Sequence, residues 1–235
     1  MITMTNFGTN GRLGNILFQY ASMIGISKEY NRELVLPKWD YSNYFTGNFP
    51  LKEIESTWQL NEKKFDYDND LLTHVLDHKI INLNGYFQSQ KYWEHCKDYV
   101  KDQLRFTNEF TKQCWIKFEN INGQIWKVKP TIAIHIRRGD YVDNPNYYQL
   151  PITYYILALE EYFPDWENKY NIVIFSDDIA YCKIHFGCMY NVYFSEGNSD
   201  IEDLCLMSCC DNFILSNSSY SWWGSYLSEG KGITV

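Results

Sequence analysis

Hydrophobic residues in the second half of the chain occur in short continuous runs that alternate with amphipathic segments. The runs predict buried strands at residues 131–136, 171–175, 192–194 and 212–215. The segments between and after them have apolar residues at helical spacing and predict helices at residues 153–163, 179–185, 200–209 and 221–227. Strands that alternate with helices at short spacing are typical of βαβ crossovers, which produce a parallel sheet. The pattern therefore predicts an α/β fold for this half.

The first half follows the same pattern less regularly. It opens with an alternating strand over residues 2–7, a loop with three glycines and an amphipathic helix over residues 15–30. Further strands are predicted at residues 34–36 and 80–87, and further helices at residues 90–104 and 108–118. Residues 38–78 are aromatic and polar without a clear period, and we assign no element there. A polar stretch at residues 120–123 divides the chain into two predicted domains, residues 1–123 and 124–235.

Composition narrows the function classes. The 235 residues have a formal net charge of −8, which argues against a nucleic-acid-binding protein because such a surface needs a basic face. Aromatic residues make up 18% of the chain, and Tyr and Trp have flat apolar rings with polar edges that suit sugar binding as well as a core. No apolar run approaches the roughly 18 residues of a membrane span. Seven cysteines without a CxxC pair, and no signal peptide, predict reduced thiols in a cytoplasmic protein.

Charge is distributed unevenly along the chain. Residues 126–235 carry 7 basic and 14 acidic side chains, and two of the basic ones are the neighbours Arg137 and Arg138. They follow the first buried strand of this half. Ligands of parallel α/β sheets bind beyond the carboxyl ends of the strands, so we expect the polar residues after each strand to meet at one edge.

The segment HIRRGDY at residues 135–141 places two guanidinium groups at the end of that strand. A guanidinium group matches phosphate oxygens with two parallel hydrogen bonds, and Gly139 would let the backbone pass close to a ligand. In extended backbone Arg137 and Arg138 point to opposite faces, so one could bind ligand while the other binds Asp140 or Asp177. The alternative is a salt-bridge cluster without a ligand. His135 either orients the loop or contacts the ligand.

Two further segments follow the other strands. Serines and an amide begin the predicted last helix, where hydroxyls and free N–H groups could bind an anion: Asn217, Ser218, Ser219 and Ser221. The alternative for this turn is simple helix capping. The carboxylates Asp177 and Asp178 either cap a helix or accept hydrogen bonds from Arg138 or a nucleotide. No third carboxylate or histidine stands at ligand spacing, so we predict no metal site.

The glycine loop of the first half, NGRLGNILFQYA at residues 10–21, leads into a helix. It lacks the GxGxxG spacing, so it does not predict dinucleotide binding. Arg12 and Asn15 lie at this turn, where a ligand could contact them.

Five segments together resemble the α-1,2-fucosyltransferases of glycosyltransferase family 11. GRLGNILFQYA is similar to the family's GxLGNQMFQYA, and residues 85–92 resemble its GYFQS-x-x-Y segment. HIRRGDY and FSDD match family motifs, and LSNSSYSWWGSYL at residues 215–227 resembles its SNSSFSWWGAYL. The chain departs from the family at Ile16, where the family has Gln, and at Leu17, where it has Met. The chain stops at residues 232–235, where another strand is expected, and the resemblance implies that the family's final segment is missing.

The resemblance implies a GT-B-like fold, with two Rossmann-like lobes whose parallel sheets face a cleft. It places the donor GDP-β-L-fucose on the C-terminal lobe and the acceptor mainly against the N-terminal lobe. It also implies an inverting reaction without a metal or other cofactor. Carried over, Arg137 would hold the diphosphate, Arg138 and Asp140 would shape its loop, and Ser218, Ser219 and Ser221 would add phosphate contacts.

The sequence hypothesis is therefore transfer of L-fucose to the 2-hydroxyl of a β-galactoside in a glycan. Asp140 is the candidate for a catalytic base, and Asn15 is a candidate for orienting the acceptor hydroxyl. The alternatives are a different GDP-sugar or linkage, and a glycan-binding module without activity. We predict a cytoplasmic protein, with peripheral contact to the inner face of a membrane left open.

Overall fold

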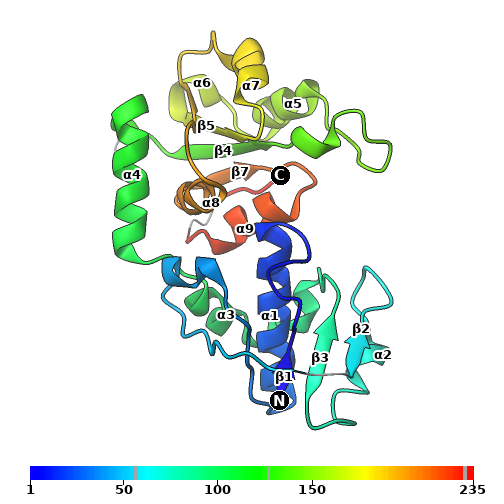
Figure 1. Cartoon of the computed structure of the whole chain (residues 1–235). Helices are drawn as coiled ribbons and strands as arrows, with labels where there is room; N and C mark the ends of the chain where they lie inside the picture. The colour runs from blue at the N-terminus through cyan, green and yellow to red at the C-terminus, as the bar shows by residue number, and fades with distance from the viewer. Residues whose placement is uncertain (56–57, 126–127, 230–231) are drawn as a thin grey trace. The chain divides into compact units, whose positions relative to one another are not determined.

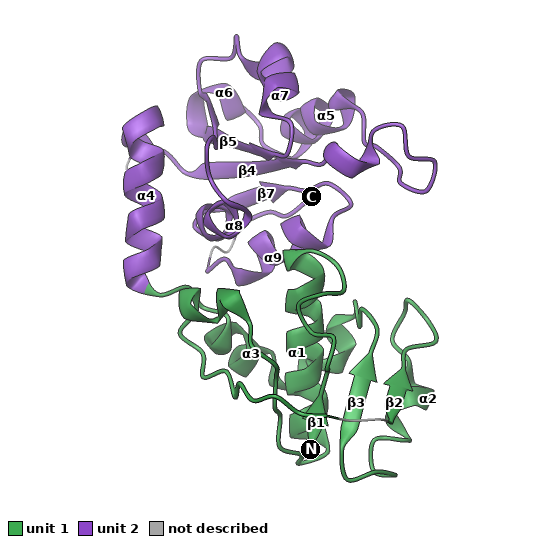
Figure 2. Ribbon diagram, in the orientation of Figure 1, with its two compact units in different colours: residues 1–107 green, residues 108–235 purple. Residues whose placement is uncertain are grey.

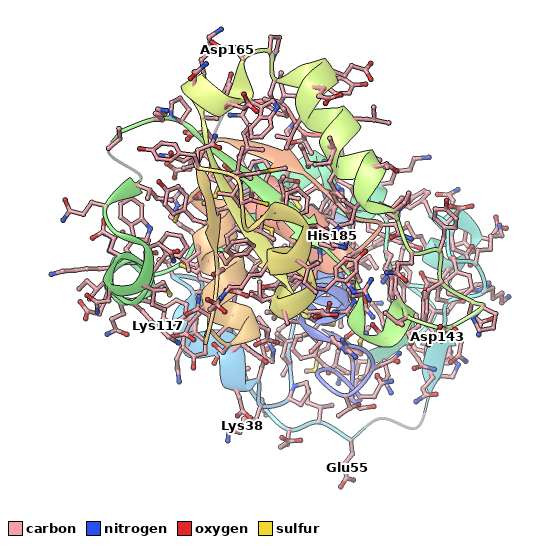
Figure 3. The ribbon with its side chains drawn as sticks, turned by 90° about the horizontal axis from the view of Figure 1, so that it is seen from above. Lys38, Glu55, Lys117, Asp143, Asp165 and His185 are labelled. Carbon is pink, nitrogen blue, oxygen red and sulfur yellow. The ribbon has the colours of Figure 1, made fainter. Side chains whose placement is uncertain are left out.

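The computed structural model describes residues 1–55, 58–125, 128–229 and 232–235, and it divides into two compact units. The units are residues 1–107 and 108–235 (Figure 2). The boundary lies earlier than the expected division after residue 123, because helix α4 (Asn108–Asn122) packs against helix α8 (Asp200–Ser208) of the second unit. Lys117 of α4, labelled in Figure 3, donates to both carboxylate oxygens of Glu202 at 2.8 and 3.0 Å. Helix α4 therefore belongs to the second unit.

The second unit contains a parallel sheet of four strands in the order β6-β5-β4-β7. The strands are β4 (Thr131–Ile136), β5 (Asn171–Ser176), β6 (Val192–Phe194) and β7 (Asn212–Ile214). All four were predicted from the apolar runs. Residues 233–235 run parallel to β7, with the Val235 N–H donating to the Phe213 carbonyl at 3.0 Å. Where a further strand was expected, the described residues 232–235 extend the sheet only by this isolated parallel bridge.

Helices connect these strands, and all but the short helix Trp166–Lys169 were predicted from the pattern. They are α5 (Ile152–Tyr162), α6 (Trp166–Lys169), α7 (Ile179–Phe186), α8 and α9 (Ser219–Leu227), and Figure 1 shows their order. A core cluster joins alternate residues of β4 and β5, such as Ile134 and Ile172, to Leu159 of α5 and Phe186 of α7. Because residues at i and i+2 share one face of a strand, α5 and α7 cover the same face of the sheet. Helix α8 packs against α4 and α9.

The first unit contains a smaller parallel sheet in the order β1-β3-β2. Its elements are β1 (Ile2–Thr3), α1 (Leu13–Glu29), η1 (Asp40–Tyr44), β2 (Gln59–Asn61), α2 (Asn69–Leu72), β3 (Ile81–Asn84), η2 (Gln90–Tyr92), η3 (Glu94–Cys96) and α3 (Lys97–Gln103). Residues 34–36, predicted as a strand, form isolated parallel bridges, including Leu34 with Ile2.

Three expectations for this unit need correction. The first strand is short because the N–H of Phe7 turns back to the Met4 carbonyl, and the N–H of Thr5 binds the Asn82 side chain. The helix expected over residues 90–104 is two 3₁₀ turns followed by α3. Strand β2 and helix α2 lie in residues 38–78, where the sequence predicted nothing.

Much of the aromatic excess is core. Trp39 contacts the rings of Phe7, Tyr20, Phe45 and Phe49 at centroid distances of 5.2 to 6.0 Å, so these aromatics stabilise the first unit rather than a ligand. All seven cysteines are free thiols. Among the described residues, no helix is long and apolar enough to cross a membrane.

Candidate functional site

The polar residues after β4, β5 and β7 lie at the carboxyl edge of the second unit's sheet. The chain runs from β4 outward through β5 to β6 and then returns to β7 on the other side of β4. The strand order therefore reverses between β4 and β7, which is the position where open α/β sheets bind ligands. Arg137 and Arg138 follow β4, and Ser216 and Asn217 follow β7.

Arg137 is held by two carboxylates at this edge. One guanidinium nitrogen lies 2.5 Å from Asp177 Oδ2, and another donates to Asp140 Oδ1. The guanidinium carbon lies 5.6 Å from the centre of the Tyr141 ring. Because the side chain is only 15% exposed and fixed from several sides, its charge is held in place before any ligand arrives.

Arg138 binds a different carboxylate, so both arginines pair with protein, whereas one of them was expected to be left for a ligand. Its Nε donates to Asp178 Oδ2 at 3.0 Å, and its guanidinium lies 3.4 Å from the centre of the Tyr181 ring. Asp178 also caps α7 by accepting the Tyr181 N–H. This hydrogen bond first, and that from Arg138 second, lower the pKa of Asp178. Both interpretations of Asp178, helix cap and partner of Arg138, are confirmed.

Asp177 connects the two arginines. It accepts the backbone N–H of Arg138 at 2.9 Å in addition to its ion pair with Arg137. A Cβ atom added at Gly139 would lie 2.3 Å from Asp177 Oδ2. In this structure the glycine is therefore needed for the close approach of a carboxylate, whereas the sequence suggested the close approach of a ligand.

His135 is buried within this edge and bound to protein. Its Nδ1 lies 2.7 Å from the hydroxyl oxygen of Ser216, which links the ends of β4 and β7. Burial lowers the pKa of His135 to about 4. The imidazole is then neutral near pH 7, which favours the loop-orienting interpretation over contact with a phosphate.

A second buried network lies at the end of β6. Asp203 of α8 accepts hydrogen bonds from Ser195 at 2.7 Å and from Asn198 at 3.0 Å. Burial raises the pKa of Asp203 to about 6. Asp203 was not predicted as a site residue because it lies inside a helix.

These two pKa shifts predict opposite dependences of stability on pH. His135 binds a proton more weakly in the folded state, so its stabilisation is present above pH ~6.5 and is lost as the pH falls to about 4. Asp203 binds a proton more tightly when folded, so its stabilisation is present below pH ~4 and is lost as the pH rises through about 6. Each pKa shift changes the free energy of unfolding by about 3 kcal/mol across its pH range.

We expect the free energy of unfolding, measured in urea between pH 4 and 7, to separate them. Relative to His135→Gln, the native chain should gain stability as the pH rises. Relative to Asp203→Asn, it should lose stability over the same range. If the stability of the native chain relative to both variants changed in the same direction with pH, these two pKa shifts would be contradicted.

The turn after β7 that carries the serines (the serine turn, residues 216–221) is compatible with only some of the predicted phosphate contacts. Ser218 caps α9 by accepting the Tyr220 N–H at 3.3 Å, and Ser219 begins that helix. Ser221 is fully buried, and its hydroxyl donates to the carbonyls of Ser216 and Ser218. The prediction of a phosphate contact is therefore corrected for Ser221, whose hydroxyl closes the turn.

Asn217 also differs from its predicted role. Its side-chain amide donates to the Tyr148 carbonyl at 3.1 Å, and its own carbonyl accepts the Tyr141 hydroxyl at 3.0 Å. Here it joins the serine turn to the loop after β4 rather than presenting its amide to a ligand. This pairing could not be predicted, because the partners are far apart along the chain.

Arg12 and Asn15 lie in the first unit, at the start of α1. Arg12 is exposed and occupies the residue before the helix. Asn15 Oδ1 accepts from Gln88 Nε2 at 2.6 Å, which joins two of the segments used for the family resemblance. Glu62 accepts the N–H groups of Tyr86 and Phe87 and so shapes the turn that carries Gln88. Glu62 was missed because it lies in the stretch without a hydrophobic period.

Among the described residues, no group of three or more His, Cys, Asp or Glu side chains is arranged to hold a metal ion. The expectation that the protein works without a metal remains a prediction. The two guanidinium groups at the reversal of strand order lie next to a helix that begins with serines, at the position where open α/β sheets bind ligands.

Comparison with known proteins identifies the family. The model of glycosyl transferase family 11 matches residues 1–235, so the chain belongs to this family and is a glycosyltransferase. An alpha-1,2-colitosyltransferase from Escherichia coli is 29% identical, covering 96% of this chain and 88% of the relative. The galactoside 2-alpha-L-fucosyltransferase Sec1 of Mus musculus is 22% identical, covering 98% of this chain and 66% of the relative.

Solved structures show the fold. POFUT1 in complex with GDP-fucose has a TM-score of 0.66 at 14% identity, covering 100% of this chain and 97% of that chain. The alpha-1,6-fucosyltransferase NodZ soaked with GDP-fucose has a TM-score of 0.59 at 12% identity, covering 97% and 92%. These neighbours are GT-B-like, and together with the two parallel sheets they confirm the predicted GT-B-like α/β fold.

Proposed function

We propose that this glycosyltransferase transfers L-fucose from GDP-β-L-fucose to the 2-hydroxyl of a β-galactoside, with inversion at the anomeric carbon. The main support is Arg137, a guanidinium held by two carboxylates at the reversal of strand order. The relative named as a galactoside 2-alpha-L-fucosyltransferase supports the linkage, and neighbours solved with GDP-fucose support the donor.

The reaction is a single displacement. The acceptor oxygen forms a bond to the anomeric carbon while the bond from that carbon to the β-phosphate oxygen breaks, GDP leaves with the electron pair, and the proton of the acceptor hydroxyl passes to solvent water. Negative charge therefore grows on the β-phosphate in the transition state. A positive group fixed beforehand stabilises this growing charge more than it stabilises the bound donor. Arg137 takes this role, and the turn with Ser218 and Ser219 at the start of α9 adds hydrogen-bond donors.

The surrounding residues position Arg137. Asp177 and Asp140 both bind its guanidinium group, and Arg138 is turned toward Asp178 and the Tyr181 ring. Because one Asp140 oxygen accepts a hydrogen bond from Arg137, we assign Asp140 to positioning rather than to deprotonation of the acceptor. Arg12 and Asn15 of the first unit remain candidates for contact with the acceptor.

A second donor is supported by a specific observation. The colitosyltransferase relative is 29% identical over nearly the whole chain. GDP-colitose differs from GDP-fucose in the sugar, whereas the diphosphate that Arg137 would bind is the same. The two donors therefore share the proposed phosphate site and differ in the contacts made by the sugar hydroxyls.

A donor competition tests the proposal. The purified chain is incubated in EDTA with a β-galactoside and with GDP-fucose, GDP-colitose or GDP-mannose in separate reactions. We expect the highest kcat/KM for GDP-fucose, with no loss in EDTA because Arg137 supplies the positive charge at the leaving group. Preference for GDP-colitose would establish the second candidate, and turnover that needs added Mg²⁺ would contradict the role of Arg137.

A further inference from the structure

The loop between β4 and α5, residues 142–151, follows the arginine site directly. Figure 1 shows it extending from the end of β4 before the chain enters α5, and Asp143, labelled in Figure 3, lies within it. Asn144 fixes the bend, because its side chain donates to the Asp140 carbonyl at 3.2 Å and accepts the Asn146 N–H at 3.0 Å. The loop thus has a defined shape next to Arg137.

Three tyrosines are arranged on this loop and its first turn. The rings of Tyr141 and Tyr147 are parallel, with their centroids 4.6 Å apart and an angle of 5° between their planes. Tyr141 is the ring beside the Arg137 guanidinium. Tyr147 is 47% exposed and Tyr148 is 71% exposed, although both are large aromatic side chains.

The backbone of this loop is tied to the turn after β7. Asn217 binds the loop at two places, through the Tyr141 hydroxyl and the Tyr148 carbonyl. Packing would normally cover aromatic surface of this size, whereas here hydrogen bonds fix the backbone and leave the rings in solvent. Because the backbone is already ordered, a flat partner that stacks on these rings has to order only their side chains.

We propose that Tyr147 and Tyr148 form a stacking platform for a pyranose ring of the acceptor glycan. This inference rests on the proposed function, and it adds an acceptor contact in the second unit. A pyranose ring has an apolar face of C–H groups and an equatorial rim of hydroxyls, which suits a tyrosine with an apolar ring and a polar tip. The acceptor hydroxyl must approach the anomeric carbon next to the phosphate, so its ring is expected close to Arg137.

The topology favours a sugar over the guanine base as the occupant. In doubly wound sheets the ribose of a bound nucleotide lies toward the end of the second strand, which here is β5. The tyrosine loop is tied instead to the turn after β7, on the opposite side of β4. The nucleoside and the tyrosine platform are therefore expected on opposite sides of the diphosphate.

The test compares three variants of the full-length chain. Tyr148→Ala removes the most exposed ring of the platform, and Tyr148→Phe retains it without the hydroxyl. Tyr190→Ala is the matched control, because Tyr190 is 97% exposed and lies before β6, at the amino end of the sheet. For Tyr148→Ala we expect a roughly 10-fold higher KM for the galactoside, with the KM for GDP-fucose unchanged. Tyr190→Ala should behave like the native chain, and Tyr148→Phe should raise the KM for the galactoside less than Tyr148→Ala does.

Binding of methyl β-galactoside in the presence of GDP, followed by saturation-transfer NMR, gives a readout that does not need turnover. Loss of the signal in Tyr148→Ala, but not in Tyr190→Ala, supports the platform even if GDP-fucose is not the donor. Equal signals in both variants, or no signal with the native chain, overturn it. A chain that binds the galactoside through Tyr148 but transfers no fucose would contradict the proposed function alone.

Discussion

Replacing Arg137 by alanine is expected to lower kcat for sugar transfer by ~10²–10³-fold, while KM for the donor changes less. The guanidinium group is fixed by Asp140 and Asp177 before the donor binds. It can therefore stabilise the negative charge of the transition state without first having to reorganise. Initial rates with GDP-fucose and a β-galactoside measure the effect. Arg137→Lys should give an intermediate loss, because lysine keeps the charge but lacks the planar group that binds two carboxylates.

Arg105→Ala is the control for this variant. Arg105 pairs with Asp102 within the first unit, and both side chains are well exposed, so we expect wild-type rates and stability. Circular dichroism of Arg137→Ala should remain that of a folded α/β protein. A folded Arg137→Ala variant with near-normal kcat would remove the main support for the proposed mechanism.

Substituting Gly139 by alanine is expected to lower kcat/KM by about 10²-fold, although no Gly139 side chain exists to contact a substrate. The added methyl group would lie 2.3 Å from Asp177 Oδ2, so the carboxylate must move. Asp177 holds both the Arg137 guanidinium and the Arg138 N–H, and its displacement therefore misplaces the group that stabilises the leaving phosphate. A misplacement of about 1 Å is enough for a loss of this size.

Asp177→Asn provides the matched comparison. Asparagine has nearly the same size but no charge, so it leaves room at Gly139 while weakening the hold on Arg137. We expect a smaller loss of kcat/KM than in Gly139→Ala and little change in thermal unfolding temperature. If Gly139→Ala were as active as the native chain, the Asp177 carboxylate would not be what positions Arg137.

The second unit could be predicted from sequence in most of its elements. In an α/β chain, a continuous apolar run such as residues 131–136 predicts a buried parallel strand. All four strands predicted in this way are present. Because ligands of parallel sheets bind beyond the carboxyl ends of the strands, Arg137, Asp177 and Ser218 were predicted to lie at one edge of the sheet. Their individual contacts could not be predicted. The alternation of extended backbone predicted different partners for Arg137 and Arg138, but not that both side chains pair with protein carboxylates.

The missed features depend on partners distant in the chain. Asn217 and Ser221 have the polar character of ligand-binding residues, and only the fold shows that their side chains hydrogen-bond to backbone carbonyls. Glu62 and β2 lie in a stretch without hydrophobic period, where tertiary contacts rather than local pattern determine the structure. The domain boundary was placed too late because a helical pattern does not reveal which neighbour covers its apolar side, and α4 packs on α8.

The most direct test of the central proposal is the structure of the product. The chain is incubated with GDP-β-L-fucose and a β-galactoside, and the purified product is examined by two-dimensional NMR. We predict fucose in the α configuration, attached to O2 of galactose, because a single displacement inverts the β-linked donor. A β-linked product, a linkage to another hydroxyl, or GDP-fucose left unconsumed would contradict the proposal.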